Sequence, residues 1–295
     1  MKKKNHMKRE ASVTERVIGE FAGRPVRIII IVLTMLAIIF PLYWLATSAF
    51  KTKADYLAKP PILIPNPASL TLENFQEVFL KDGLWNQFFN TFIVAAVSTA
   101  VSVIFGSMSA YASVRGKFSK AVKSAFGLWF MIQKMYPAIA TAIPIYLVMR
   151  NLHLIDSRLA LIIMNTSFNL PLVIWLMMGF FEQVPKELDE SAKIDGAGFV
   201  QRFFEIVFPV TKPGIIASAI LAFIGAWNEF LFAVILSINK SKTLPVVIAG
   251  FITDRGLAWG PMAATALITL VPIVIVVWIA QKDFVQGLAM GAVKG

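Results

Sequence analysis

The sequence predicts an all-α membrane protein, a bundle of six transmembrane helices in a single membrane domain. Two observations lead to this prediction. The 295 residues are 57% hydrophobic and only 15% charged, with a mean hydropathy of +0.71, whereas soluble domains are about half apolar and about a quarter charged. The chain also contains continuous apolar runs long enough to cross a hydrocarbon core of about 30 Å as helices.

The predicted spans are joined by polar segments of unequal charge. Lys and Arg are about twice as frequent in the segments on the side of the N-terminus as in those on the other side, a bias that marks the cytoplasmic side. Both termini are therefore expected in the cytoplasm, with a basic segment at 1–27, a membrane domain at 28–281 and a tail at 282–295. We expect the spans at about 28–49, 88–112, 124–149, 158–181, 214–238 and 261–281.

The first span is expected to stay in the mature protein, because it is too long for a signal-peptide core and no small-residue cleavage site follows it. Residues 50–87 form the longest external connection. In this connection PPILIPNP predicts extended or turn structure, and LTLENFQEVF predicts a short amphipathic helix at the surface. That segment would either cap the bundle or contact an external partner.

Small residues recur every four positions in the second and fifth spans. Such rows allow helices to approach closely in lipid. They would serve packing within this chain or packing against a second membrane subunit. The positions are Ser98, Ser102, Gly106 and Ala110 in one span, and Ser218, Ala222 and Ala226 in the other.

A charged segment, ELDESAKIDGAGFVQRFFEIVFP at 187–209, interrupts the apolar pattern. It predicts two short amphipathic helices joined at Gly196 and Gly198. In the first helix, Leu188 and Ala192 belong to a face of low profile. Its polar face is predicted to consist of Glu187, Asp189, Glu190 and Lys193. By spacing alone, this pair of helices would either dock into a groove of another protein or lie on the membrane surface.

The same segment resembles the cytoplasmic loop of permeases in the ABC importer superfamily. That loop has the pattern E-A-A, three residues, G, nine residues, I-x-L-P, and ESAKIDGA is similar to its EAAxIDGA form. Here the pattern is met by Glu190-Ser191-Ala192, Gly196 and Ile206-Val207-Phe208-Pro209, with Ser191 and Phe208 as mild departures. Three further stretches resemble the six-span subunit of maltose-type carbohydrate importers: AWNEFLFAVIL, LTLENFQEVF followed by FFNTFIVA, and the ending QKDFVQGLAMGAVKG.

The resemblance implies that residues 182–213 are a coupling loop seated in a cytoplasmic ATPase subunit. The expected partners are a second permease, two ATP-binding subunits that hold ATP and Mg²⁺, an extracellular or periplasmic solute-binding protein, and a mono- or oligosaccharide. The expected location is a bacterial-type cytoplasmic (inner) membrane. The implied coupling residues are Glu190, Ser191, Ala192, Asp195, Gly196, Ile206 and Pro209, and the tail residues implied to reach the ATPases are Val293, Lys294 and Gly295.

The chain itself is expected to be non-catalytic and to hold no cofactor or metal. Its Gly116-Lys117 pair is followed by Phe118 and lacks the phosphate-binding GxxxxGK[ST] arrangement. It has no cysteine and only two histidines, His6 and His153, which are too few and too far apart for a ligand cluster. The energy for transport must therefore arrive from a partner.

Polar residues within the spans are the candidates for a sugar path, because polar groups in lipid are costly and often functional. Pro137 and Pro144 predict a kink or break in the third span. Each polar residue would either line the path or bond between helices, and for Glu229 bracing of the bundle is the favoured role. The candidates are Gln133, Tyr136, Asn165, Asn169, Trp227, Asn228 and Glu229.

Two alternative functions remain open from the sequence. A permease of the same superfamily could carry another solute, such as glycerol phosphate, because the loop pattern contains no information about which solute is transported. An ion-coupled secondary transporter would also be a helical bundle, but it would usually show an inverted repeat and carboxylates for the coupling ion. No internal repeat is evident in the sequence, and Glu229 is the single carboxylate suited to that role.

Overall fold

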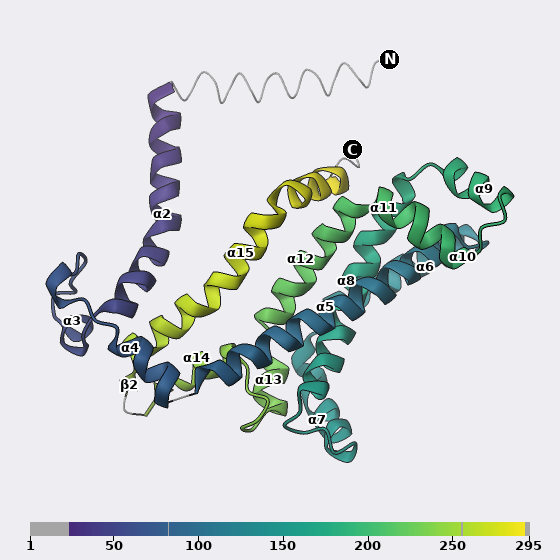
Figure 1. Ribbon diagram of the computed structural model, residues 1–295. Coiled ribbons are helices and arrows are strands. Elements are labelled where there is room, and N and C mark those ends of the chain that lie inside the picture. The colour runs from purple at the N-terminus through teal and green to yellow at the C-terminus, as the bar shows by residue number, and fades with distance from the viewer. Residues whose placement is uncertain (1–23, 82, 255, 293–295) are drawn as a thin grey trace.

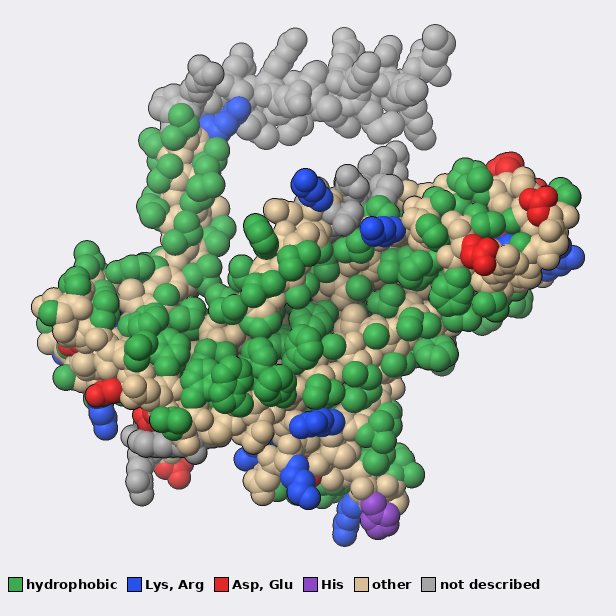
Figure 2. Space-filling view, viewed as in Figure 1, with side chains coloured by type: hydrophobic (Ala, Val, Ile, Leu, Met, Phe, Trp, Pro, Cys, Tyr) green, Lys and Arg blue, Asp and Glu red, His purple; other side chains and the backbone are tan. Residues whose placement is uncertain are grey.

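The computed structural model describes residues 24–81, 83–254 and 256–292, without the side chains of 24, 25, 81 and 283–292. Four helices in this part of the chain are long and apolar enough to cross a membrane. They are α2 (Arg24–Phe50), α5 (Leu84–Arg115), α8 (Arg158–Gln183) and α15 (Trp259–Ala292) (Figure 1). Hydrophobic side chains cover much of their surface in Figure 2, as lipid-facing helices require.

The predicted span at 124–149 is broken, as its prolines indicate. Helix α6 (Lys120–Met135) ends before Tyr136, whose extended backbone (φ −70°, ψ 129°) is the conformation favoured before a proline. A short 3₁₀ turn, η3 (Ala138–Thr141), then leads into α7 (Ala142–Asn151).

The predicted span at 214–238 is not one continuous helix, which corrects the sequence prediction. Helix α12 (Lys212–Trp227) ends at Asn228, and the chain restarts as α13 (Leu231–Leu236). No proline or glycine marks this break. The Glu229 carboxylate supplies its cause, because it accepts hydrogen bonds from the backbone N–H groups of Phe232 (2.7 Å) and Ala233 (3.0 Å) at the start of α13.

Helices α5 and α8 pack side by side at the centre of the bundle, with α12 against both. All the small residues predicted to mediate close packing are buried within this chain. At Gly106, an added Cβ would lie 2.8 Å from Cγ1 of Val173 on α8, so the two helices approach too closely for any larger residue. The rows of small residues therefore serve packing inside this chain.

Helix α2 stands apart from this centre for most of its length (Figure 1). Its side chains from Val26 to Tyr43 are exposed. Only near its end does it pack on α15, where Ala49 meets Ala263 and Ala264.

The connection that follows α2 contains α3 (Lys53–Leu57), the 3₁₀ turn η1 (Pro67–Ser69), α4 (Glu73–Gln76) and the π-helical turn η2 (Glu77–Lys81). The predicted amphipathic helix is thus present as α4 and η2. Asn74 of α4 is buried and donates to the carbonyl oxygens of Ala49 and Lys51, each at 2.9 Å. This segment caps the bundle where α2 ends and α15 begins. Beside it lie α14 (Leu244–Gly250) and a small hairpin of β1 (Ile252–Thr253) and β2 (Gly256–Leu257).

Candidate functional site

The loop between α8 and α12 folds as two helical segments joined by a glycine turn. The first is α9 (Lys186–Ile194), and the second runs through α10 (Phe199–Gln201), the π-helical turn η4 (Arg202–Val207) and α11 (Phe208–Val210). Both lie at the end of the bundle where α5 and α8 finish and α12 starts (Figure 1). We call this the α9 end.

Gly196 has a defined structural role in ending α9. Its φ is +85°, in the left-handed region that favours glycine. The N–H of Gly196 donates to the carbonyl of Lys193 (3.2 Å), and the N–H of Ala197 donates to the carbonyl of Ala192 (3.0 Å). These two bonds form a Schellman motif, so the glycine of the sequence pattern fixes the angle at which α9 leaves the second segment.

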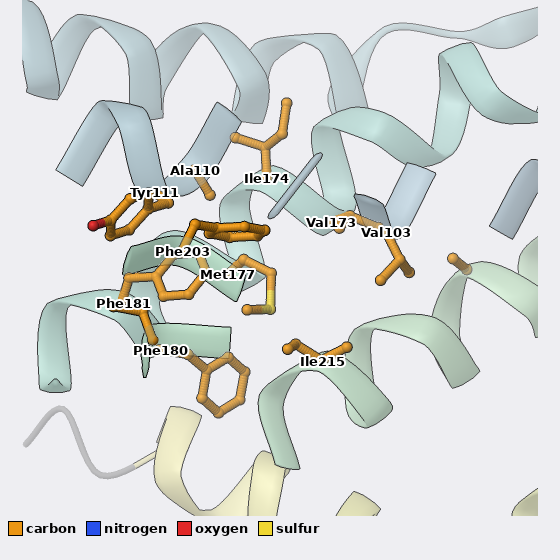
Figure 3. Packing of buried hydrophobic residues seen from close by; sticks show 12 residues of the cluster. Val103, Ala110, Tyr111, Val173, Ile174, Met177, Phe180, Phe181, Phe203 and Ile215 are labelled. Atoms are coloured by element: carbon orange, nitrogen blue, oxygen red, sulfur yellow. The ribbon is translucent and has the colours of Figure 1, made fainter. Parts of the chain in front are cut away.

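The second segment is anchored in the bundle by aromatic packing. Phe203 and Val207 are fully buried in a cluster with Tyr111 of α5 and with Phe180 and Phe181 of α8 (Figure 3). The ring centroids of Tyr111 and Phe203 lie 5.4 Å apart. This segment is therefore a fixed base, from which α9 projects.

The anchor of α9 itself is a buried carboxylate. Asp189 accepts a hydrogen bond of 2.6 Å from the hydroxyl of Tyr111, and its side chain is only 12% exposed. The Nε atoms of Arg115 and Arg202 lie 3.9 Å and 3.7 Å from its two oxygens. We call these four residues the Asp189 cluster. The sequence placed Asp189 on the polar, outward face of the helix, which was wrong, because this residue points into the bundle.

The predicted coupling residues divide into two groups. Ala192 is buried, and Ile206 packs against the aromatic cluster, so both face their own chain. The remaining five are exposed at the α9 end: Glu190, Ser191, Asp195, Gly196 and Pro209.

One exposed apolar side chain on α9 was missed. Ile194 is 86% exposed, and Leu188, which the sequence analysis assigned to the face of low profile, is 43% exposed. Figure 2 shows several acidic side chains at this end of the molecule. A helical-wheel plot of α9 that started from Ala192 as the inward residue would have placed Ile194 outside, since two residues correspond to about 200° of rotation.

The predicted path residues also divide. Gln133 and Tyr136 are exposed and line a cavity of about 530 Å³, together with Ser167 on α8. Asn165 and Asn169 are buried and bonded instead: the side-chain amide of Asn165 donates to the carbonyl of Leu161 (2.9 Å), and that of Asn169 to the carbonyl of Ala222 on α12 (3.1 Å).

The three residues at the break after α12 have separate positions. Trp227 is buried, and its Nε1 donates to the carbonyl of Thr269 on α15 (3.1 Å). Asn228 is exposed and donates to the carbonyl of Ile224 (2.9 Å). Glu229 caps α13, as described above. The tail residues Val293, Lys294 and Gly295 lie outside the described residues.

A larger cavity, of about 760 Å³, lies nearer the α9 end. It is lined by Lys123 and Gly127 of α6 and by Trp175, Gly179 and Glu182 of α8, among others. Six of the α8 residues that line the two cavities follow helical spacing along one face: Met164, Phe168, Pro171, Trp175, Gly179 and Glu182. The two cavities therefore follow one another along the same side of α8.

The opposite end of the bundle is held by a second aspartate that the sequence analysis did not single out. Asp156 precedes α8, and its carboxylate accepts hydrogen bonds from the backbone N–H groups of residues 238–241, at 3.0 to 3.2 Å, and from the Ser241 hydroxyl at 3.1 Å. We call this arrangement the Asp156 clamp. Partial burial alone would raise the pKa of Asp156, but the N–H groups of Lys240, Ile238, Ser241 and Asn239 together hold it below its ordinary value.

Asn90 of α5 extends this end. Its side-chain amide donates to the carbonyls of Lys240 (2.8 Å) and Lys242 (2.9 Å), and its oxygen accepts from Nε of Arg158 (2.6 Å). The loop after α13 is thus tied to both α5 and α8.

Comparison with known proteins agrees with this architecture. The family described as "Binding-protein-dependent transport system inner membrane component" matches residues 102–282. A melibiose/raffinose/stachyose import permease, MelC of Bacillus subtilis, is 35% identical over 272 residues, covering 90% of this chain and 96% of the relative. A trehalose/maltose transport permease, MalG of Thermococcus litoralis, is 31% identical and covers 94% and 99% of the two chains.

A solved structure has the same fold. A chain of a bacterial ABC transporter involved in import of the acidic polysaccharide alginate aligns with a TM-score of 0.75 at 22% identity, over 92% of this chain and 98% of that one. The family match spans most of the membrane domain, and the relatives are aligned almost end to end. This chain belongs to the family of inner-membrane components of binding-protein-dependent transport systems.

Proposed function

We propose that this chain is a permease subunit of an ATP-driven importer for a mono- or oligosaccharide. It works with a second permease, two ATP-binding subunits and a solute-binding protein outside the membrane. The observation that carries this proposal is the form of α9, a short charged helix that projects from a fixed base and leaves Ile194 86% exposed.

The free face of α9 supports docking to an ATPase. It combines apolar Leu188 and Ile194 with acidic Glu190 and Asp195. Burial of such an exposed isoleucine side chain by a partner is favourable by about 1.5–3 kcal/mol of free energy. ATP and Mg²⁺ then belong to that partner. The α9 end is cytoplasmic in this proposal, as are both termini, and Val293, Lys294 and Gly295 add a second contact to the ATPases.

The two cavities along α8 support a solute path on that side of the helix. Gln133 offers an amide and Tyr136 an aromatic ring beside the cavity of about 530 Å³, which lies next to the break between α6 and η3. Non-helical backbone at membrane depth is tolerated where it lines a cavity. Asn165 and Asn169 act in helix packing, while Trp227 and Glu229 brace the break after α12.

Sugar is the proposed cargo because of the relatives' substrates and the chemistry of the cavity of about 530 Å³. The named relatives import melibiose, raffinose, stachyose, trehalose or maltose. Uncharged hydroxyl-rich solutes are held by amides, hydroxyls and aromatic faces, which Gln133, Ser167 and Tyr136 provide.

The test is purification of the tagged chain from its native membrane with every bound subunit. The assembly is reconstituted with its solute-binding protein, and ATP hydrolysis is measured with maltose, trehalose, melibiose or raffinose. The proposal expects an ATP-binding subunit and a second permease, with hydrolysis stimulated by one of these sugars. A chain that purifies alone and moves solute under an ion gradient would contradict it.

A further inference from the structure

The Asp189 cluster is built in an unusual way for an anchor. Its carboxylate comes from α9, its hydroxyl and one guanidinium come from α5, and the second guanidinium comes from η4. The rings of Phe199, Phe203 and Phe181 pack on Tyr111 at centroid distances of 4.9, 5.4 and 5.8 Å. The cluster therefore joins three elements inside an aromatic shell.

Charge is a costly means of merely holding a helix in place. Removing a carboxylate and guanidinium from water carries a desolvation cost that a well-packed apolar contact avoids. The aromatic residues around Tyr111 provide such a contact for the second segment, to which α9 is joined. Because a charged anchor is costly, the buried carboxylate of α9 indicates a role beyond attachment.

The geometry of the cluster provides that role. The Tyr111 hydroxyl is within hydrogen-bond distance of the carboxylate, whereas both Nε atoms are at 3.7–3.9 Å, beyond the roughly 2.7–2.9 Å of a charge-assisted hydrogen bond. Among the described residues, these two buried Nε atoms have no hydrogen-bond partner. Each contact would have to shorten by only about 1 Å to become such a bond, so the cluster has a second arrangement within reach.

The cluster also connects to the proposed path. Arg115 donates from Nη2 to the carbonyl of Val184 just after α8 (2.6 Å) and itself lines the larger cavity. Helix α5 packs along α8, which lines both cavities. A force applied to α9 therefore reaches α5 and α8 through one carboxylate.

We propose that Asp189 is the positioning residue through which movement of α9 is passed to α5 and α8, with Tyr111, Arg115 and Arg202 as its partners. Closure of the ATPases shifts α9, the two guanidiniums bond to the carboxylate, and the α5–α8 pair follows. This inference rests on the proposed function and assigns the transmission step to a cluster that faces away from the ATPase.

The first test variant is Asp189→Asn, which keeps an oxygen for the Tyr111 hydroxyl but removes the charge. It is studied in the complete reconstituted assembly, with the sugar that stimulates wild-type hydrolysis most. We measure the ATPase subunit retained on purification, hydrolysis without sugar, and sugar transported per ATP hydrolysed. The expected result is normal retention of the ATPase, with transport per ATP at least about fivefold lower.

Two further variants make the test decisive. Tyr111→Phe removes only the hydroxyl and keeps the ring in its aromatic shell, and it should lower transport per ATP in the same direction by a smaller factor. If Asp189→Asn does not assemble, Tyr111→Phe still tests the proposal through the same ratio of transport to hydrolysis. The matched control is Glu205→Gln on η4, an exposed carboxylate bonded to Gln201 at 3.0 Å, which should leave the ratio unchanged.

An unchanged ratio in both cluster variants would overturn the proposal. So would a parallel fall in transport and hydrolysis, because that is the behaviour of a merely structural anchor. Failure of the proposed function is seen separately: it appears in the wild-type chain, as absence of an ATPase subunit or of sugar-stimulated hydrolysis, before any variant is compared.

Discussion

Two aspartates hold the two ends of this bundle, and they do so with opposite chemistry. Asp156 accepts from four consecutive backbone N–H groups and a hydroxyl at hydrogen-bond distance. Asp189 accepts one hydrogen bond, while its two guanidinium partners stand at 3.7 and 3.9 Å. The Asp156 carboxylate thus makes several hydrogen bonds, whereas the Asp189 carboxylate makes one hydrogen bond and two longer ionic contacts.

The difference indicates which end moves. A carboxylate ringed by backbone donors fixes the path of the chain, since any displacement breaks several bonds together. A carboxylate facing side chains at longer distance permits α9 to shift with little loss. The Asp156 end therefore behaves as the fixed frame of the permease, and α9 behaves as its moving part.

The largest effect on stability is expected from disrupting the Asp156 clamp. Asp156→Asn removes the negative charge and replaces one of the two acceptor oxygens that serve four N–H groups and one hydroxyl. The free energy of unfolding should therefore fall by roughly 2–4 kcal/mol. Thermal unfolding in detergent measures this loss. The control, Asp254→Asn in the exposed turn between β1 and β2, should unfold like wild type, and equal stability of the two variants would refute the clamp.

The same variant has a defined pH dependence. Because the pKa of Asp156 is lowered in the folded protein, its contribution to stability is present above the unfolded pKa of about 3.9 and is lost as the pH falls toward the lowered value. The stability gap between wild type and Asp156→Asn should be constant above about pH 4 and shrink below it. A gap that widened in acid would contradict this assignment.

The next largest effect is expected at the Gly196 turn, which sets the angle between α9 and the second segment. Gly196 and Gly198 are both exposed, and an added Cβ would meet nothing within 4 Å at either, but only Gly196 has a positive φ. Gly196→Val should therefore strain the backbone by about 1–3 kcal/mol. If that strain opposes docking of α9, uptake should fall by at least about fivefold, the factor that corresponds to 1 kcal/mol. Gly198→Val is the matched control, and equal uptake by the two variants would show that the turn angle is unimportant.

A smaller effect is expected at the tip of α9. Ile194→Ser should leave folding unchanged, since the side chain is 86% exposed, and should weaken ATPase affinity by about tenfold, or roughly 1.4 kcal/mol. Val200→Ser on α10, which is 56% exposed, is the comparison. Binding assays with the isolated ATPase subunit would reject the docking face if both variants bound as wild type.

The smallest effect is expected at the break after α12. Glu229→Gln keeps one acceptor for the start of α13 and loses the charge, so stability should fall by about 0.5–1 kcal/mol. The order of preference among maltose, trehalose, melibiose and raffinose should not change. An altered order of sugars with unchanged stability would place Glu229 in the path instead.

The sequence predicted those features that depend on neighbouring residues. Apolar runs gave the long helices, Tyr136-Pro137 gave the break in the third span, and the glycine of the loop pattern coincides with the left-handed turn at Gly196. Each of these follows from local backbone preference or local hydrophobicity.

The features it missed depend on distant contacts. Asp189 sits among acidic residues on a nine-residue helix, and only Tyr111, 78 positions earlier, reveals that it faces inward. The Asp156 clamp closes across more than 80 positions. The break after Trp227 has no proline or glycine to announce it. A carboxylate that later caps α13 looks, in sequence, like any charge in a span.

The most direct test of the account is cross-linking from single cysteines, which the chain allows because it has none of its own. Ser191→Cys on α9 and Asn239→Cys in the Asp156 clamp, both exposed in the structure, would be joined to their neighbours in native membranes and identified by mass spectrometry. If α9 docks on an ATPase, an ATP-binding polypeptide should be cross-linked to Cys at position 191 and none to Cys at position 239. The same neighbours at both positions, or no ATP-binding polypeptide at position 191, would contradict it.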